Sequence, residues 1–388
     1  MRDFWEDIRR EFPVVRRWIY FNHAGVAPVP ARTAAAVQLF MDEALYNGAC
    51  VYDRWMARVE GVRRQFAGII GAYPGEIAFV KNTSHGLSIV ANGLDWNKGD
   101  NIVTARGEFP ANIYPWMALK DRGVELRTVM PRNGRVAVED LAKAIDARTR
   151  LLTISSVEFG NGFRNDLESI GRLCKEKNIL FCVDAIQSLG ALPLDVRKCY
   201  IDFLSTDGHK WLLAPEGTGC FYCSMEKLDL LKPPLIGWNS VKNSRDYSHY
   251  NFTLRPDAQR FEEGSPSVMG ISALGASLGL LQEIGLDKIE ERVLFITDRI
   301  ISGLEERGYA IRTPRGDGEK SGIVSFQSRK PATILQQLLA GKDVACAARD
   351  GALRVSPHFY NSEEEVNRFF GILDEVDVTA KANKRGEK

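Results

Sequence analysis

The chain has 388 residues, 45% of them hydrophobic, and its 51 basic and 50 acidic residues give a net charge of +1. This balance excludes the basic excess of a dedicated nucleic-acid-binding protein, so no nucleic-acid partner is expected. No apolar run approaches the roughly 18–20 residues of a membrane span, and the charged start MRDFWEDIRREF has no signal-peptide core. We therefore expect a cytoplasmic protein with no membrane partner.

The first part of the chain is predicted to be mostly helical. Residues 4–12 have the spacing of a short amphipathic helix, and WIYFNHAGVAPVP (18–30) predicts a strand that runs into a Gly/Pro-rich loop. Two longer helices are expected over 33–46 and 53–70.

From residue 76 onward, short apolar strands alternate with helices. The strands include EIAFV (76–80), NIVTA (101–105), VELRTV (124–129) and ILFCVDA (179–185). Such strands, separated by helices, predict an α/β fold with a buried, mostly parallel sheet and helices on both faces. The run GCFYCS follows closely on the element before it, which is compatible with an antiparallel strand.

The length allows one large domain and a smaller one. We assign residues 21–264 to a large domain that carries the site, and residues 265–388 to a smaller C-terminal α/β domain on which residues 1–20 pack. Residues 232–264 are irregular and rich in Pro, Asn, Ser and Tyr. They suit an active-site loop or an interface segment equally well.

The seven cysteines are scattered and odd in number, which indicates reduced thiols rather than a disulfide framework. Cys220 and Cys223 have C-x-x-C spacing, but no second pair or histidine cluster accompanies them. Because the run has the character of a strand, we interpret both as buried strand thiols and expect no metal site.

Ligands of open α/β sheets bind at the carboxyl ends of the strands, so polar residues that follow strands are candidate site residues. In NTSHG (82–86), Thr83 and Ser84 open a helix whose free N–H groups and hydroxyls suit a phosphate. An ordinary N-cap explains the same residues without a ligand. No G-x-G-x-x-G or P-loop motif is present, which weakens a dinucleotide or nucleotide reading.

Two more strand ends carry candidate residues. Phe109, in GEFPAN, is placed to cover a planar ring, although a core phenylalanine fits the position as well. Asp184 directly follows five apolar residues, so its carboxylate needs a cationic partner or a helix N-terminus. Gln187 lies three residues further on.

Lys210 lies 26 residues beyond Asp184, between His209 and Trp211. An apolar wall and a nearby cation lower the pKa of a lysine, which then becomes a nucleophile able to form a Schiff base. Arg354 offers a planar two-pronged contact to a carboxylate, or else a structural ion pair. A pyridoxal phosphate enzyme requires a phosphate-binding site, an aromatic residue over the ring, an acid, an amine and a group that binds a carboxylate, and the candidates above supply each of these.

With these motifs the sequence resembles the class V aminotransferase family of fold-type I pyridoxal phosphate-dependent enzymes. That family includes cysteine desulfurases, kynureninases and isopenicillin N epimerase-like proteins. The resemblance covers nearly the whole chain, through YFNHAGVAPVP, NTSHG, GEFPAN, VDAIQSLGALPLDV, DGHKWLLAPEGTG, RFEEGSP and LRVSPHFYN. The pair VDAIQS…DGHKW, with its spacing, is the specific part.

The resemblance implies a role for each candidate. Lys210 would hold pyridoxal phosphate as a Schiff base, and Asp184 would keep the ring nitrogen protonated. The other implied cofactor contacts are Gln187 at the phenolic oxygen, Phe109 on the ring, Thr83, Ser84 and His209 at the phosphate, and Ser265 lent by a neighbouring subunit. The implied substrate contacts are Arg354 at the α-carboxylate, with Asn22 and His23 at the mouth of the site. The Ser265 segment implies a homodimer with a shared active site.

Three positions depart from the family pattern. Asp207 lies near a place where relatives often carry serine; an acid is a poor phosphate ligand, so we expect it to orient His209 or nearby backbone. Cys346 lies eight residues before Arg354 in a short segment expected to be a strand. It therefore differs from the nucleophilic cysteine that desulfurases carry on a long loop. Glu158 falls where relatives often place an amide or hydroxyl, and its role is open.

The predicted function is a pyridoxal phosphate-dependent enzyme that acts at Cα or Cβ of a small amino acid, with an aminotransferase favoured. A lyase (cysteine desulfurase, selenocysteine lyase or C–S lyase type) and an epimerase stay open, because reaction choice depends on small differences in the site. A catalytically silent binding protein and a nucleotide-binding protein are the alternatives from other classes.

Overall fold

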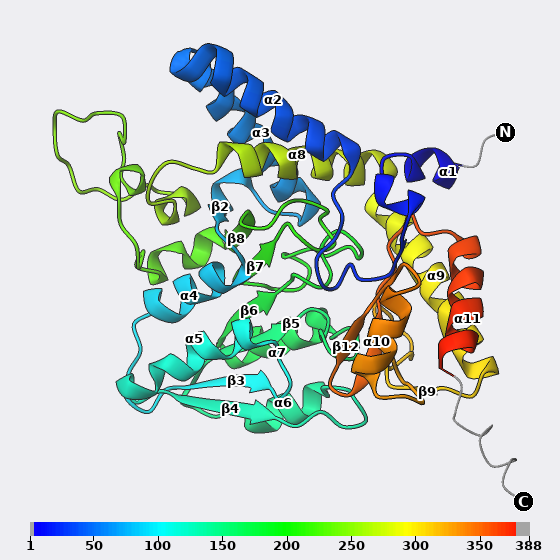
Figure 1. Cartoon of the computed structure of the whole chain (residues 1–388). Coiled ribbons are helices and arrows are strands. Elements are labelled where there is room, and N and C mark those ends of the chain that lie inside the picture. The colour runs from blue at the N-terminus through cyan, green and yellow to red at the C-terminus, as the bar shows by residue number, and fades with distance from the viewer. Residues whose placement is uncertain (1–3, 378–388) are drawn as a thin grey trace, which may run out of the picture.

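A seven-stranded sheet lies at the centre of the computed structural model, which describes residues 4–377 (Figure 1). The strand order is β2-β8-β7-β6-β5-β3-β4. The strands are β2 (Ile77–Val80), β3 (Asn101–Ala105), β4 (Glu125–Val129), β5 (Thr149–Ser155), β6 (Leu180–Asp184), β7 (Phe203–Asp207) and β8 (Gly219–Cys223). Strand β8 is antiparallel to both of its neighbours, β2 and β7, and the other six strands share one direction. The predicted mostly parallel sheet is confirmed, and GCFYCS is its antiparallel strand.

Helices cover both faces of this sheet because both faces are apolar. In β5, Leu151 and Leu152 point to opposite sides and belong to different core clusters. The clusters join the sheet on one side to α3 (Tyr52–Ile69), α6 (Val138–Ala144), α7 (Leu167–Lys177) and α8 (Val268–Ile284), and on the other to α4 (Thr83–Gly93) and α5 (Tyr114–Met117). Successive strand residues alternate between faces, so a two-sided core needs the near-continuous apolar runs seen in the sequence.

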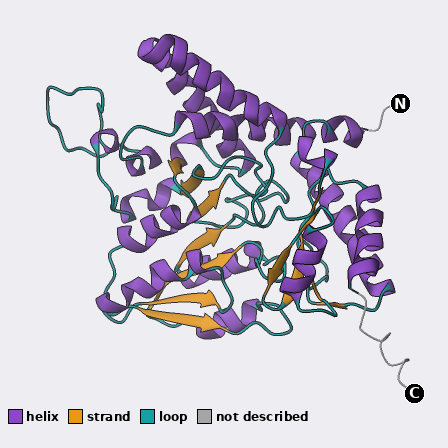
Figure 2. Cartoon of the chain, viewed as in Figure 1, coloured by secondary structure: helices purple, strands orange, loops and turns teal. Residues whose placement is uncertain are grey.

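A smaller sheet, β12-β13-β10-β9, lies beside the large one (Figure 2). It comprises β9 (Ala310–Ile311), β10 (Val324–Gln327), β12 (Ala347–Arg349) and β13 (Ala352–Val355), with helices α9 (Leu286–Glu306), α10 (Ala332–Ala340) and α11 (Glu363–Val376) around it. A separate parallel pair, β1 (Ile19–Tyr20) and β11 (Val344–Ala345), joins the start of the chain to this part. Arg9 of α1 (Phe4–Arg9) also forms a 2.7 Å ion pair with Glu365 of α11.

Helix α8 lies within residues 265–388, the predicted small domain, but it packs against α2 (Ala31–Asn47) and α3. The Thr33 hydroxyl of α2 lies 2.6 Å from that of Ser277 in α8. The domain boundary at residue 265 stays a prediction, and residues 378–388 of the predicted small domain lie outside the described residues. Within residues 4–377 no single helix has the length and hydropathy of a membrane span; α8 and α9 pass only as a pair bent by 83°.

Cys220 and Cys223 both lie in β8 and are buried. They belong to the two different core clusters and so face opposite sides of the sheet. Burial raises the pKa of both thiols, as expected for strand cysteines that pack as small apolar side chains.

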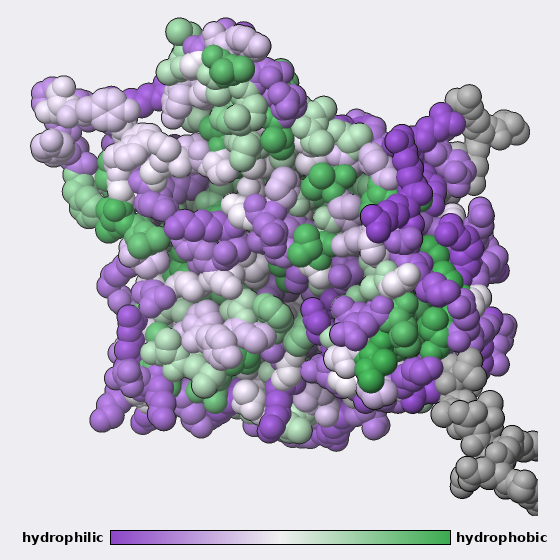
Figure 3. Space-filling model, viewed as in Figure 1, coloured by the Kyte–Doolittle hydropathy of each residue, from purple (hydrophilic) through white to green (hydrophobic). Residues whose placement is uncertain are grey.

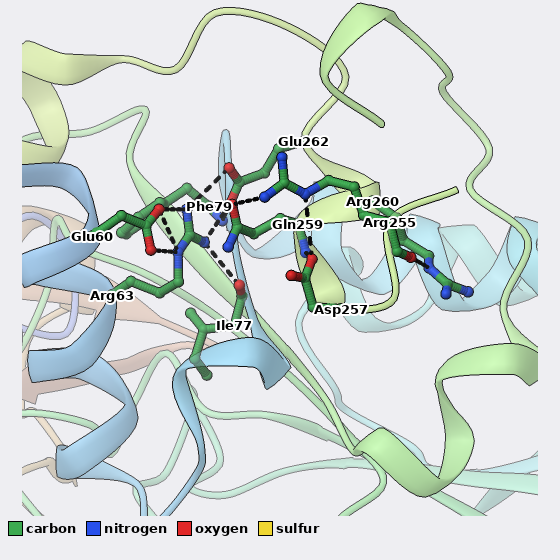
Figure 4. A network of polar contacts seen from close by, with 9 residues as sticks. All are labelled: Glu60, Arg63, Ile77, Phe79, Arg255, Asp257, Gln259, Arg260 and Glu262. Atoms are coloured by element: carbon green, nitrogen blue, oxygen red, sulfur yellow. Dashed lines mark hydrogen bonds and ion pairs between the residues drawn. The ribbon is translucent and has the colours of Figure 1, made fainter. Parts of the chain in front are cut away.

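A buried ion pair fixes the segment that leads to Ser265 (Figure 4). Arg63 of α3 donates to Glu262 over 2.5 Å and to the carbonyl of Ile77 over 2.8 Å. The same Glu262 carboxylate accepts from the backbone N–H of Phe79, over 2.8 Å. Because both charged groups are buried and hydrogen-bonded, the pair ties α3 and β2 to the 258–264 segment.

Replacing Glu262 by leucine should therefore destabilise the protein by about 3–5 kcal/mol, because it leaves the Arg63 charge buried beside only the half-exposed Glu60. The matched control is Asp95→Ala, which breaks the exposed Lys232–Asp95 pair and should cost less than about 1 kcal/mol. The change in the free energy of unfolding of each variant can be measured from the midpoint of its urea denaturation curve, provided that the slope of the transition stays constant. Equal shifts for the two variants would contradict this assignment.

Candidate active site

One cavity of about 440 Å³ lies at the carboxyl edge of the large sheet, facing the small sheet. It collects residues that are far apart in the sequence: Thr83, Ser84, Phe109, Asp184, Gln187, His209, Lys210 and Arg354 all line it. Eight of the predicted site residues thus share one space. They do so because β2, β6 and β7 end at the same edge, and β13 supplies the arginine from the opposite side.

Lys210 enters this cavity from the loop after β7. Gly208 allows close packing of the chain there: a Cβ on it would lie 2.8 Å from Cβ of Ala214 and 3.0 Å from the Thr218 carbonyl. The Lys210 side chain is 8% exposed, and its amine lies 5.5 Å from the centroid of the Phe109 ring. Burial lowers the pKa of the amine to about 8, with Asp184 acting against this and Arg354 adding to it.

Asp184 ends β6 and is 1% exposed. One oxygen accepts a hydrogen bond from the backbone N–H of Ile186 over 3.1 Å. Burial raises the pKa of the carboxyl to about 6, while that hydrogen bond and the Lys210 charge lower it. Asp184 and Lys210 therefore line one cavity and interact electrostatically, which gives an acid and an amine, each shifted toward its neutral form.

The N-terminus of α4 forms another wall. Asn82 is the N-cap, since its side chain accepts from the N–H of His85 over 3.0 Å. Thr83 and Ser84 are thus the first helical residues, and neither is the cap that the sequence allowed. The Thr83 hydroxyl is buried without a hydrogen-bond partner, so it and the helix N-terminus are available to an anion.

Two aromatic rings and an amide define the middle of the cavity. Phe109 is 42% exposed and meets Phe159 edge to face, with ring centroids 5.2 Å apart. The Gln187 amide donates to the carbonyl of Ala24 over 3.1 Å and accepts from the Trp211 indole over 3.0 Å. These two contacts fix the orientation of the amide at the cavity wall.

Arg354 on β13 is buried at 1% exposure. One of its nitrogens donates to the carbonyl of Phe159 over 2.7 Å, whereas its Nε and Nη2 atoms are buried without partners. Burial and, after it, the charge of Arg349 lower the pKa of the guanidinium. A guanidinium with two unpaired donors beside a cavity is suited to a carboxylate ligand.

Asp207 has the positioning role expected for it. One oxygen accepts from the backbone N–H of Gly208 over 2.7 Å, and the other lies 3.0 Å from Nδ1 of His209. It thus fixes the loop backbone by a hydrogen bond, and it places a carboxylate beside the imidazole.

Glu108 and Glu158 form a buried acidic pair beside Asp184. Glu108 accepts from the backbone N–H and the hydroxyl of Ser155, and Glu158 accepts from Asn165 over 2.8 Å. Burial and repulsion by Glu158 raise the pKa of Glu108, and burial and Asp184 raise that of Glu158 to about 7. Burial and like-charge repulsion therefore shift both groups toward their protonated forms.

Three expectations at the edge of the site, those for His23, Asn22 and Cys346, come out differently. The prediction that His23 lines the mouth is wrong: it is fully buried, with its ring bonded to the Ser356 carbonyl and the Tyr360 hydroxyl. Asn22 also lies outside the cavity lining and pairs in a bridge with Ser356. Ser265, which was expected to serve a neighbouring subunit, lines a separate cavity of about 330 Å³ that shares only Gly217 with the first, and its role stays a prediction. Cys346 lies between β11 and β12 rather than in a strand, is buried, and does not line the cavity.

The sequence reasoning missed several wall residues, of which Arg349 and Phe159 matter most. Arg349 lies on β12 and Phe159 on the loop after β5. Phe159 follows β5 as closely as Phe109 follows β3, so the strand-end rule could have found it, whereas Arg349 lies away from the strand ends of the large sheet. Glu216, at the exposed rim, was missed for the same reason.

Comparison with known proteins extends this picture. The sequence profile of the family described as Aminotransferase class-V matches residues 19–369. A probable cysteine desulfurase of Methanothermobacter thermautotrophicus is 32% identical over 96% of this chain and 98% of its own length. An uncharacterized aminotransferase, YcbU, of Bacillus subtilis is 29% identical over 96% of this chain and 97% of its own.

Solved structures agree in fold. The apo structure of a cysteine desulfurase from Thermococcus onnurineus has a TM-score of 0.88 at 29% identity, over 97% of this chain and 98% of that one. The cystine C-S lyase C-DES has a TM-score of 0.87 at 24% identity, over 93% and 98%. The family match spans both sheets and confirms the resemblance inferred from the sequence: the chain belongs to the class-V aminotransferase family of pyridoxal phosphate-dependent enzymes.

Proposed function

We propose that this protein uses pyridoxal phosphate to act at the Cα–H bond of a small amino acid, with transamination as its reaction. The observation that carries the proposal is the joint lining of one cavity by Lys210 and Asp184, whose pKa values are shifted to about 8 and about 6. A lysine amine whose pKa is lowered toward neutral pH has a larger uncharged fraction than an ordinary lysine, which suits it to covalent catalysis and to proton transfer.

The residues of the cavity fit this cofactor. The orphaned Thr83 hydroxyl and the start of α4 offer an anion site, Phe109 offers an aromatic face, and Asp184 offers a buried carboxylate for a protonated ring nitrogen. When bound, pyridoxal phosphate supplies an aldehyde for amines and a ring that withdraws electrons from Cα.

Each of the main cavity residues has a separate role in the proposed reaction. Lys210 binds the cofactor, and once released it holds and moves the Cα proton on its Nζ atom. Asp184 holds a proton at the ring nitrogen. Arg354 binds the α-carboxylate through its unpaired nitrogens and thereby sets which Cα bond faces Lys210. Phe109 shields one side from water.

A lyase reaction is the second candidate, since relatives spanning nearly the whole chain are described as cysteine desulfurases. Persulfide formation needs an accessible thiolate. Among the residues that line the cavity there is no cysteine, and burial raises the pKa of Cys346 to about 12. The geometry therefore favours transfer over desulfuration.

We also propose that the protein works as a cytoplasmic homodimer in which Ser265 serves the partner's phosphate site. Its separation from the chain's own cavity supports this. So do the exposed apolar residues Leu39, Leu45 and Tyr46 of α2, and Figure 3 shows apolar surface on the projecting end of the molecule. Sedimentation velocity that shows only monomer would contradict the dimer.

The experiment that tests the reaction is a screen of amino acids with the cofactor-loaded protein, with and without a keto-acid acceptor. Keto acid, sulfide and pyruvate are scored together. We expect product only in the presence of acceptor. Acceptor-independent sulfide or pyruvate would instead establish the lyase, and a protein that gains no cofactor absorbance on reconstitution would refute the proposal.

A further inference from the structure

The cavity contains a second arginine that the transfer reaction does not use. Arg349 on β12 and Arg354 on β13 belong to neighbouring antiparallel strands, in which Ala347 pairs with Arg354 and Arg349 pairs with Ala352. Paired residues, and residues two apart on a strand, share a face of the sheet. Both guanidinium groups therefore project from the same face, and both line the cavity.

Neither arginine forms an ion pair with a carboxylate among residues 4–377. Arg349 donates to the carbonyl of its neighbour Ala348 over 2.8 Å, and Arg354 donates to that of Phe159. Of the acids that line the cavity, Asp184 interacts with Lys210 and Asp207 with His209, whereas Glu216 lies at the exposed rim, where Arg349 is exposed as well. Asp350 offsets only part of the repulsion between the two arginines, because Arg349 lowers the pKa of Arg354 more than Asp350 raises it.

Two like charges at one cavity repel, and the arrangement is relieved by a ligand with two negative groups. We infer that the substrate is a short acidic amino acid, with its α-carboxylate on Arg354 and its side-chain carboxylate on Arg349. This inference rests on the proposed function, because it assigns the α-carboxylate to Arg354.

The walls limit the length of that side chain. Ala24, Ala111, Phe159 and Ile186 supply small or apolar surface, so the arginines are the groups that recognise charge on the substrate side. The same space of about 440 Å³ has to hold the cofactor as well. A short acidic side chain therefore fits, and the one lining acid that could pair with a cationic side chain, apart from Asp184 and Asp207, is Glu216 at the exposed rim.

The test compares succinate with butyrate, which have the same carbon number and differ by one carboxylate. Calorimetric titration of the cofactor-loaded protein at fixed ionic strength should show succinate binding about tenfold more tightly, because of the second charge-assisted contact. Arg349→Gln should remove most of this preference and leave butyrate binding unchanged. Its effect on turnover should be a raised KM for L-aspartate with little change for L-alanine.

The matched control is Arg368→Gln, an exposed arginine on α11 that does not line the cavity. It should alter neither ligand. Equal affinities for succinate and butyrate, or an Arg349→Gln variant that weakens both equally, would overturn the inference while the proposed function stands. Failure of the protein to take up the cofactor would instead refute the proposed function itself.

Discussion

Replacing Lys210 by alanine is expected to lower turnover by at least about 10³-fold, because the substitution removes both the covalent attachment point and the proton carrier. Lys210 is the only lysine among the described residues that line the cavity. Its buried amine lies near the Phe109 ring and interacts with Asp184. Borohydride reduction followed by mass spectrometry should detect the cofactor on the native chain and none on the variant.

The control for this experiment is Lys177→Ala, an exposed lysine at the end of α7. It should keep both turnover and the covalent adduct. Retention of covalent cofactor by Lys210→Ala would show that another amine does the chemistry, and the mechanism proposed for this cavity would fail.

Asp184→Asn is expected to reduce turnover by about 10²–10³-fold, the range found when one preorganised electrostatic contact is removed. The amide is nearly isosteric and can still accept from the N–H of Ile186, so β6 should keep its structure. It cannot carry the negative charge that keeps a ring nitrogen protonated. Absorbance titration should also show cofactor attachment shifting to lower pH, because Asp184 raises the pKa of the Lys210 amine.

Asp202→Asn provides a matched control. Asp202 precedes β7 and accepts from the N–H of Phe181 over 2.9 Å, and burial raises the pKa of its carboxyl as well. It lies outside the cavity lining. Any loss of stability common to the two variants is structural, whereas the loss of turnover should be confined to Asp184→Asn. Comparable turnover losses in both variants would contradict the assigned role.

Much of the architecture could be read from periodicity alone. Strands such as β5 and β6 are near-continuous apolar runs that alternate with helices along the chain. This pattern requires a sheet that is buried on both faces. Parallel strands then place Asp184 and the Lys210 loop at one edge. The positions of these residues directly after strands therefore predicted the location of the site. Thr83, Phe109 and Gln187 were found by the same rule, that ligands bind at the carboxyl ends of the strands.

Other features needed the folded chain. His23 follows a strand and is polar, yet Ser356 and Tyr360 satisfy both its ring nitrogens, and burial lowers its pKa so that it serves as a neutral packing group. Nothing local in the sequence shows that contact, since the partners are more than 300 residues away.

The sequence by itself determined the fold class, the family and the acid–amine pair, because these depend on short-range periodicity and on motifs with fixed spacing. Tertiary structure decided which charges lack a partner. Arg349 and Arg354 share one face of the small sheet because β12 pairs with β13. Ser265 lies outside its own chain's cavity because Arg63 holds the 258–264 segment. Charge compensation depends on distances between segments remote in the chain, and no local pattern encodes those distances.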